Sequence, residues 1–368
     1  MVDLVPVALV SAAIAIAAIL SVRFNISSAI FEVAAGIVLG NFLGVGIDGW
    51  LDFLGTFGGL MLTFLAGAEI ETRLMRKNLK LSLALGSMSF LAPLVGEVLF
   101  FSFFTDWGLT TILVASLALT TTSVAVVYAV LTEYDLLKLP LGGAIIAVTF
   151  VNDILTLVGV NLLSPSVNYF TVLFIVLVIA AAVLIPRLLR KVVSSYGRRS
   201  VEVELRLVIA LILLMALVAD AGKLHAVFGV FLLGFLFANN IQEYEEIRSK
   251  IRTVTFALLS PAFFIKAGLL IDLGAVANSG AIILGALAAK LASKVVGTYP
   301  LTRKWLPEGA IFSTLMLSTG LTVGTITATL GLELGLLTRD QFTSVVMAVI
   351  LSAVVPTLIA KRFIPRKL

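Results

Sequence analysis

The stretch LALTTTSV (Leu117–Val124) places three threonines and a serine inside a long apolar segment, and it returns in altered form as LMLSTGLT (Leu315–Thr322). These two stretches lie 198 residues apart. A second pair, LAGAEIE (Leu65–Glu71) and KAGLLID (Lys266–Asp272), recurs at an offset of 201. Two matches at nearly the same offset indicate that the chain consists of two related halves.

The composition is that of a membrane protein. Hydrophobic residues make up 60% of the chain, charged residues only 13%, and the mean hydropathy is +1.14. A soluble domain carries about 25% charged residues. Apolar runs long enough to cross a hydrocarbon core of about 30 Å as helices recur from end to end. We therefore predict an all-α polytopic fold, because the alternating pattern of a membrane β-barrel is absent from the sequence.

Short polar segments and Gly or Pro residues divide the chain into about thirteen transmembrane helices. The expected spans are residues 4–22, 26–44, 50–68, 81–104, 110–131, 141–163, 168–186, 203–221, 224–239, 253–271, 277–299, 308–332 and 341–360. Both repeat matches pair one span with the seventh span after it. Since seven is odd, the two copies must be inverted in the membrane, an architecture typical of secondary transporters.

Hydroxyl groups and glycine can interrupt a membrane helix, because side-chain oxygens and a lined cavity satisfy the freed backbone groups. The two related stretches carry such residues near the middle of the fifth and twelfth spans. We expect these spans to be discontinuous helices that cross, with Thr121 in the first and Thr319, Gly320 and Thr322 in the second. The alternative is that the hydroxyls only pack at helix interfaces or bond to their own helices.

The distribution of basic residues predicts the orientation. With the N-terminus outside, 21 of the 26 Lys and Arg residues collect on the cytoplasmic side, and only Lys223 and Arg339 lie on the other side. The C-terminus is then cytoplasmic, and we expect a multi-pass protein of the plasma membrane. Lys266, Lys290 and Lys294 lie within spans.

Several function classes find no support in the residues. There is no cysteine, and a single histidine, His225, cannot build a multi-histidine metal site. No connection is long enough for a nucleotide-hydrolysing domain, and the net charge of +5 is explained by membrane topology. We therefore expect a transporter and not an enzyme, with the lipid bilayer as its surroundings, no cofactor, and no nucleic-acid or nucleotide partner.

Asp153 lies at the centre of the sixth span, next to Asn152. A charged residue at that depth costs about 2.5–3.5 kcal/mol on insertion scales, so it faces protein or water and usually marks an ion or proton path. The competing interpretation is a structural carboxylate neutralised by a lysine. Lys290 and Lys294 lie four residues apart on one helical face and are the candidate partners. Lys294 could instead extend to the membrane interface.

Other polar residues within spans have less definite roles. We expect Lys266 to extend outward to the membrane interface. Glu97 could be a second carboxylate of the core. Kinks are predicted at three prolines, Pro93, Pro261 and Pro356.

A family resemblance covers nearly the whole chain. It rests on FLAGAEIE (Phe64–Glu71), ALTTTSVAVVYAVLTE (Ala118–Glu133), the pair Asn152–Asp153, GVFLLGFL (Gly229–Leu236), SPAFFIKAGLLIDL (Ser260–Leu273), SKVVG (Ser293–Gly297) and STGLTVGT (Ser318–Thr325). Together these motifs resemble the monovalent cation:proton antiporter superfamily, in the branch of bacterial and archaeal sodium/proton exchangers.

The resemblance implies a homodimer in which a core domain moves like an elevator against a dimerisation domain. The implied division is residues 1–76 (dimerisation, first part), 77–165 (core, first part), 166–200 (linker helix), 201–274 (dimerisation, second part) and 275–368 (core, second part). It also implies that Asp153 binds sodium and the proton in alternation, assisted by Thr122 and Ser123, with Lys294 at the charge-partner position. Asn152 either ligates the ion or only braces the helix break.

We therefore predict a secondary antiporter that exchanges sodium or lithium for protons by alternating access. A carboxylate removed from water resists ionisation, so Asp153 can hold a proton or a cation but not both. The nearest alternative is a potassium/proton antiporter of the same fold. A sodium-coupled organic-anion symporter, as in the bile-acid symporter family, is a more distant one. Asn-Asp pairs resemble the electroneutral branch, yet Lys294 stands where those relatives carry arginine, so the ion ratio stays open.

Overall fold

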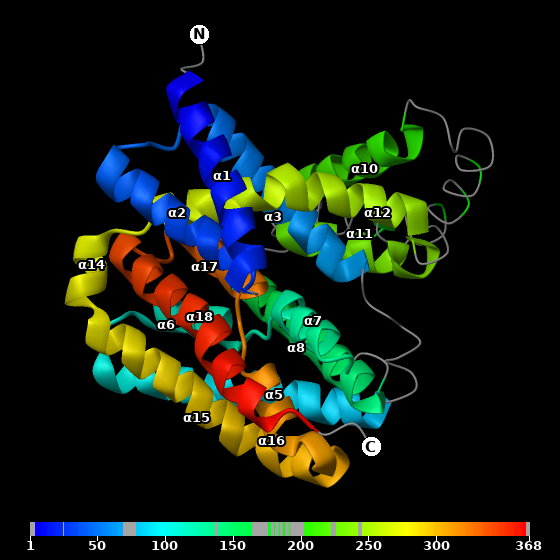
Figure 1. The fold of residues 1–368 in the computed structure, drawn as a ribbon, viewed down its shortest axis with the longest axis vertical. Helices are drawn as coiled ribbons and strands as arrows, with labels where there is room; N and C mark the ends of the chain where they lie inside the picture. The colour runs from blue at the N-terminus through cyan, green and yellow to red at the C-terminus, as the bar shows by residue number, and fades with distance from the viewer. Residues whose placement is uncertain are drawn as a thin grey trace. The chain divides into compact units, whose positions relative to one another are not determined.

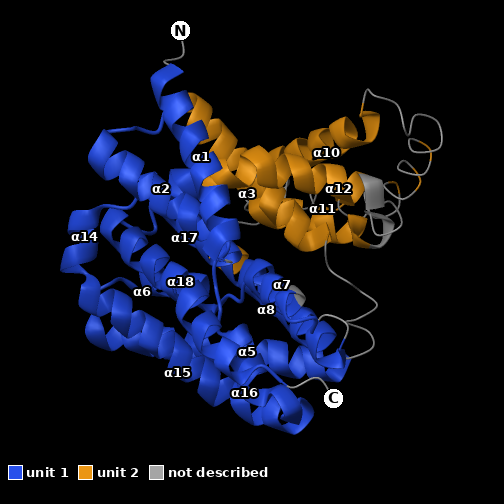
Figure 2. Cartoon of the chain, viewed as in Figure 1, with its two compact units in different colours: residues 1–48, 73–160, 264–368 blue, residues 49–72, 161–263 orange. Residues whose placement is uncertain are grey.

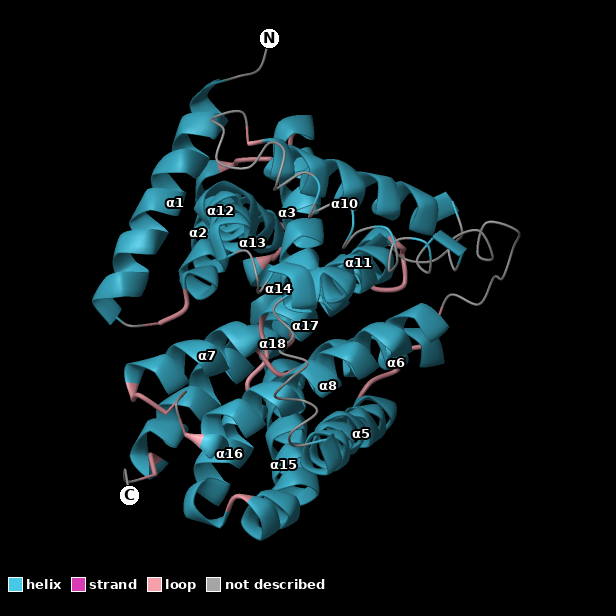
Figure 3. Cartoon of the chain, turned by 90° about the vertical axis from the view of Figure 1, so that its right-hand side faces the viewer, coloured by secondary structure: helices cyan, strands magenta, loops and turns pink. Residues whose placement is uncertain are grey.

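The computed structural model describes residues 4–24, 26–68, 79–136, 139–163, 202–221, 226–241 and 245–365, and a few positions between 176 and 191. Within these residues the chain forms helices and connecting loops, and no strand (Figures 1 and 3). The all-α prediction is therefore confirmed. The expected span at 168–186 lies largely outside the described residues, as does His225.

The described helices follow the apolar runs closely. In chain order they are α1 (Leu4–Phe24), α2 (Ser28–Leu43), α3 (Gly49–Ala68), α5 (Leu79–Phe104), α6 (Leu109–Thr120), α7 (Val124–Glu133), α8 (Pro140–Leu162), α10 (Val203–Ala221), α11 (Ala226–Ile241), α12 (Glu245–Val254), η1 (Thr255–Leu259), α13 (Ser260–Leu269), α14 (Leu273–Asn278), α15 (Gly280–Trp305), η2 (Pro307–Gly309), α16 (Ala310–Leu317), α17 (Thr322–Glu333), α18 (Arg339–Ala360) and η3 (Lys361–Phe363).

Many of these helices are suited to cross a bilayer. Among the described residues, nine segments have the length and apolar composition of a membrane span, and the broken pairs α6–α7 and α16–α17 count as one segment each. The helices α2 and α11 are shorter apolar helices of the same kind. The chain is a multi-pass membrane protein.

Two compact units make up the chain (Figure 2). The first contains residues 1–48, 73–160 and 264–368, and the second contains residues 49–72 and 161–263. In the second unit α3 packs along α11, with the rings of Phe64 and Phe237 edge to face at 5.5 Å between centroids. The division into a core and a dimerisation domain that the resemblance implies stays a prediction.

The tenth expected span differs from its prediction at its start. Residues 253–271 were expected to form it, but the helix begins at Glu245 with the polar, basic α12 and continues through a π-helical turn, η1, into α13. Pro261 is the second residue of α13 and lacks an N–H to donate. A π-helical turn directly before it shifts the hydrogen-bond pattern, so the helix passes the proline without a break. Pro93 and Pro356 lie inside α5 and α18.

The prediction that Lys266 extends to the membrane interface is wrong. Only 6% of its side chain is exposed, and its Nζ donates to Glu333 Oε1 at 2.9 Å. Lys266 lies in the last turn of α13 and Glu333 is the last residue of α17. The ammonium is held inside the protein because a carboxylate on a neighbouring helix compensates its charge, which the spacing of residues along one span cannot reveal.

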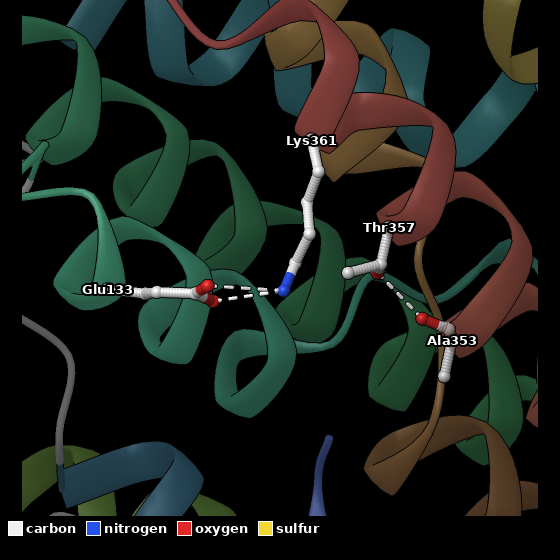
Figure 4. Close-up of polar contacts among 4 residues, drawn as sticks. All are labelled: Glu133, Ala353, Thr357 and Lys361. Atoms are coloured by element: carbon white, nitrogen blue, oxygen red, sulfur yellow. Dashed lines mark hydrogen bonds and ion pairs between the residues drawn. The ribbon is translucent and has the colours of Figure 1, made fainter. Parts of the chain in front are cut away.

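A second ion pair lies at the corresponding end of the other interrupted helix, the pair α6–α7. Lys361 Nζ lies 3.1 Å from Glu133 Oε2 and 3.3 Å from Oε1, at the end of α7 (Figure 4). In the same view the Thr357 hydroxyl donates to the Ala353 carbonyl one turn earlier in α18. A cavity of about 410 Å³ lies beside this pair, lined by α1, α2, α7 and α18.

The two ion pairs differ in exposure, so their loss should differ in effect. Glu333→Gln keeps the shape of the side chain but removes its charge from Lys266, which is buried, whereas Glu333 itself is 45% exposed. A hydrogen bond to a charged group contributes about 1.5–3 kcal/mol, and the solvent around Glu333 places this pair at the lower end of that range. Glu133→Gln acts on a pair that is about a quarter exposed on each side, and exposed pairs contribute about 0–1 kcal/mol. We expect the larger drop in melting temperature for Glu333→Gln when both variants are heated in detergent. Equal drops would contradict this ranking.

Candidate ion-binding site

Two helices are interrupted in the middle of the first unit. The helix α6 ends at Thr120 and α7 begins at Val124, while α16 ends at Leu317 and α17 begins at Thr322. The segments between them are not helical. Since α6 packs against α17, the two interrupted pairs meet there. The predicted fold of crossing discontinuous helices is confirmed.

The two breaks are hydrogen-bonded to each other. The Ser123 N–H donates to the Thr319 carbonyl at 3.1 Å. The Thr122 hydroxyl donates to the Leu317 carbonyl, the last of α16, at 2.8 Å. Every side chain from Thr120 to Ser123 is at most 2% exposed. Backbone groups released by one break are thus satisfied by the other, as buried polar groups require.

The remaining hydroxyls of the predicted crossing stay close to their own helices. The Thr121 hydroxyl donates to the Ala118 carbonyl at 3.1 Å, and Ser123 Oγ accepts from the Val126 N–H at 3.3 Å in the first turn of α7. Thr319 bonds back to the Met316 carbonyl at 2.7 Å. Thr322 is the first residue of α17.

Asn152 braces the first break with both ends of its amide. Its Oδ1 accepts from the Thr122 N–H at 3.1 Å, and its Nδ2 donates to the Thr120 carbonyl at 3.2 Å. One side chain on α8 therefore replaces a donor and an acceptor that the interrupted helix has lost. These contacts are those of a brace, which is one of the two roles that the sequence leaves open for Asn152. Its other role, as an ion ligand, stays a proposal.

Asp153, the next residue, is 2% exposed in the middle of α8. Within the described part of the chain its Oδ1 has no hydrogen-bond partner. Its charge interacts through space with that of Lys294. A buried carboxylate with an unused oxygen needs a positive partner, and a proton or a small cation would supply one.

Lys294 is wholly buried, so the alternative that it extends to the membrane interface is wrong. Its Nζ donates to Ser89 Oγ on α5 at 2.8 Å and to Thr122 Oγ1 at 3.1 Å. The ammonium therefore contacts the same break that Asn152 braces. It lies close enough to Asp153 to act on its charge, although its hydrogen bonds go to hydroxyls.

Lys290 reaches the second break from the same face of α15. Its side chain is wholly buried, and its Nζ donates to Ser352 Oγ on α18 at 2.9 Å. Ser352 Oγ lies 3.3 Å from the Gly320 carbonyl, and a Cβ on Gly320 would meet Lys290 Nζ. Lys294 thus contacts the first break and Lys290 lies at the second. Of the two, Lys294 is the lysine whose charge interacts with that of Asp153.

The sequence reasoning missed the two serines that hold these lysines. Ser89 and Ser352 are small hydroxyl residues within spans, and residue type alone does not distinguish them from packing serines. A signal for Ser352 was present, because it lies 199 residues after Asp153, within the range of offsets that relates the two halves. Ser89 had no such signal.

We expect Asn152→Asp to weaken the break. An ionised aspartate offers only acceptors, so the Thr120 carbonyl would lose its donor and face a negative oxygen. Leaving a buried acceptor unsatisfied costs about 1–3 kcal/mol. The melting temperature in detergent should therefore fall and recover partly at low pH, where the carboxylic acid can donate. Unchanged stability at alkaline pH would show that the amide donor is dispensable.

Residues 9–364 match the family described as sodium/hydrogen exchanger, transmembrane. The chain belongs to this family. The match extends over almost the whole sequence, so both helix breaks and the residues around Asp153 lie within it. The family resemblance inferred from the motifs is confirmed, and the sodium/hydrogen exchangers are membrane transporters.

Several curated relatives have the same extent. The chain is 26% identical over 365 residues to a probable Na(+)/H(+) antiporter 3 of Methanocaldococcus jannaschii, covering 94% of this chain and 92% of the relative. It is 27% identical over 382 residues to the Na(+)/H(+) antiporter NhaS4 of Synechocystis, covering 93% and 92%. A relative in Bacillus cereus, 25% identical over 373 residues, is named Na(+)/H(+)-K(+) antiporter GerN.

Solved structures share the fold. The sodium proton antiporter MjNhaP1 from Methanocaldococcus jannaschii at pH 8 aligns with a TM-score of 0.70, covering 97% of this chain and 98% of that one at 13% identity. An electron-microscopy structure of the same antiporter aligns with a TM-score of 0.72 at 15% identity. At this identity the likeness concerns the fold of the exchanger.

Proposed function

We propose that this exchanger moves sodium ions in one direction and protons in the other, with both competing for Asp153. The observation that carries the proposal is the position of that carboxylate: it is buried in α8, beside the two breaks, with an oxygen that no described residue uses. A charged residue so placed in a membrane helix commonly belongs to an ion path.

The residues around Asp153 suit a small hard cation. The ligands proposed beside Asp153 are the Asn152 amide and the hydroxyls of Thr122 and Ser123, all of which offer oxygen. Oxygen ligands are what alkali cations take, so sodium or lithium is the proposed cargo, carried without a resident cofactor. To use the Thr122 hydroxyl as a ligand, the ion would compete with Lys294, which donates to it.

Competition at one carboxylate couples the two fluxes. In a dry site the ionised form of Asp153 requires a neutralising charge, which a bound cation supplies; a proton instead removes the need for one. Both together would leave an uncompensated positive charge, which is costly in a low dielectric. Lys294 can compensate Asp153 while the site changes cargo. After a cation is released on one side, a proton must therefore bind Asp153 before the sodium-free site returns to the other side.

The finer features of transport follow from the same proposal. We propose a homodimer in the plasma membrane, with the N-terminus outside and the C-terminus in the cytoplasm. An elevator movement of the core would carry Asp153 between the two sides. The names of the relatives favour sodium over the potassium alternative, since the potassium-moving relative is itself named as a sodium/proton antiporter.

Purified protein in lipid vesicles with a trapped pH-sensitive dye tests this function. With an acidic interior, addition of sodium outside should raise the internal pH, and lithium should do the same. Potassium should act weakly. A sodium pulse that leaves the internal pH at the level of empty vesicles would falsify the proposal, and a response to potassium alone would replace it with the potassium/proton alternative.

A further inference from the structure

A second buried carboxylate, Glu97 of α5, takes no part in the Asp153 site. Its side chain is wholly buried, and within the described part of the chain neither of its oxygens has a hydrogen-bond partner. A carboxylate without donors is strongly disfavoured in its ionised form inside a protein, whereas a protonated carboxyl is tolerated. Glu97 is therefore suited to hold a proton.

The packing of α5 against α15 places Glu97 beside Lys290. The two helices run side by side in opposite directions (Figure 1). Gly96 lies against Ser293, and Gly297 lies against Ala92, so their backbones approach closely. In this register the residue after Gly96 faces the turn of α15 that carries Lys290. Among the described residues, Lys290 is the cation whose charge acts on Glu97.

The two lysines of α15 connect Glu97 to the cation site. Lys290 and Lys294 are one turn apart, both wholly buried, and their charges act on each other. Lys294 in turn acts on Asp153. The structure thus contains a row of four ionisable groups in the order Asp153, Lys294, Lys290 and Glu97, enclosed by α5, α8 and α15.

A buried row of charges resists any change in its net charge. While the site is free of cation, the Asp153 carboxylate compensates Lys294, and a protonated Glu97 stands beside the Lys290 ammonium. When a sodium ion takes Asp153, Lys294 loses its compensating charge one turn from another ammonium. Loss of the proton from Glu97 restores the net charge that the row had before sodium bound. The Glu97 carboxylate that remains and the Lys290 ammonium then compensate each other. In this step the O–H bond of the carboxyl breaks, one sodium ion enters and one proton leaves to water.

We infer that Glu97 is a second proton site of the exchanger, which releases its proton when a cation occupies Asp153 and takes a proton back when the cation leaves. The inference rests on the proposed function, since it requires Asp153 to bind the cation. It adds that sodium binding expels a proton even when Asp153 is already ionised. Exchange would therefore continue on the alkaline side, where competition at Asp153 alone gives no coupling.

The test is to count protons released on sodium addition to the purified full-length protein in weakly buffered detergent solution, across a pH series. The wild type should release protons at both the acidic and the alkaline end of its sodium-binding range. Glu97→Gln should keep the release at the acidic end and lose it at the alkaline end. Glu204→Gln, which removes another buried carboxyl group, in α10 of the second unit, is the matched control and should leave both unchanged.

The outcomes separate this inference from the proposed function. A wild type that binds sodium without releasing protons at any pH would remove the function itself. Release confined to the acidic end, or equal release by wild type and Glu97→Gln at the alkaline end, overturns the role of Glu97 while the function stands. If Glu97→Gln does not fold, infrared difference spectra of the wild type decide. Sodium added at the alkaline end should remove a protonated-carboxyl band, and an unchanged band overturns the inference.

Discussion

Asp153→Asn should reduce sodium-driven proton movement in vesicles to the level of empty vesicles. The substitution preserves the shape of a side chain that is 2% exposed, so the packing of α8 is retained. It removes the only negative charge that the predicted site offers to a cation. Removing one partner of a buried ion pair costs about 3–5 kcal/mol, which corresponds to a loss of sodium affinity of roughly 100- to 1000-fold or more.

Two measurements separate this loss from misfolding. Asp153→Asn should still unfold cooperatively when heated in detergent, at a melting temperature below that of the wild type, because the buried Lys294 loses its compensating carboxylate. Sodium should raise the melting temperature of the wild type through binding to the folded state, and it should have no such effect on the variant. A variant that exchanges at the normal rate would remove Asp153 from the mechanism.

Gly324→Ala should strongly destabilise the crossing of the two interrupted helices. Gly324 lies in the first turn of α17, where a Cβ would come within 2.6 Å of the Ala118 carbonyl and 2.8 Å of Thr121 Oγ1. The first of these atoms belongs to the backbone of α6 and cannot rotate away. Overpacking of this kind costs about 1–3 kcal/mol and occasionally more, so we expect a clear drop in melting temperature and reduced exchange.

Gly280→Ala is the matched control for that substitution. Gly280 begins α15, and a Cβ there would meet no atom within 4 Å. Alanine is favoured over glycine in a helix by roughly 0.5–1 kcal/mol, so this variant should be as stable as the wild type or slightly more so. If both variants melt like the wild type, α6 and α17 do not approach as closely as the structure describes.

Much of the fold could be predicted because membrane spans depend on local composition. Apolar runs determine where helices form, and the hydroxyl clusters at Thr120–Ser123 and Ser318–Thr322 mark both breaks in the sequence. The polar start of the tenth span was missed, because α12 is a charged helix that continues directly into an apolar one. Hydropathy cannot place the beginning of such a helix, since it measures burial and not backbone hydrogen bonding.

The partners of buried charges were harder to predict than their positions. Lys266 was expected at the membrane interface, yet it reaches Glu333 on a helix 67 residues further along the chain. Lys290 and Lys294 are alike in the sequence, and only the packing of α15 against α5 and α18 gives them different serines. Contacts of this kind depend on how helices face one another, which periodicity within a single span does not contain.

The hydrogen bonds between the two breaks restrict how the cargo can travel. Ser123 and Thr319 join their backbones, and Thr122 joins its side chain to the end of α16. Sliding one interrupted helix past the other would leave these groups without partners in a region that excludes water. The segments that form the two breaks around Asp153 are therefore expected to move together as one rigid body. The deformation that this movement requires is expected in the loops and helix ends at its edges.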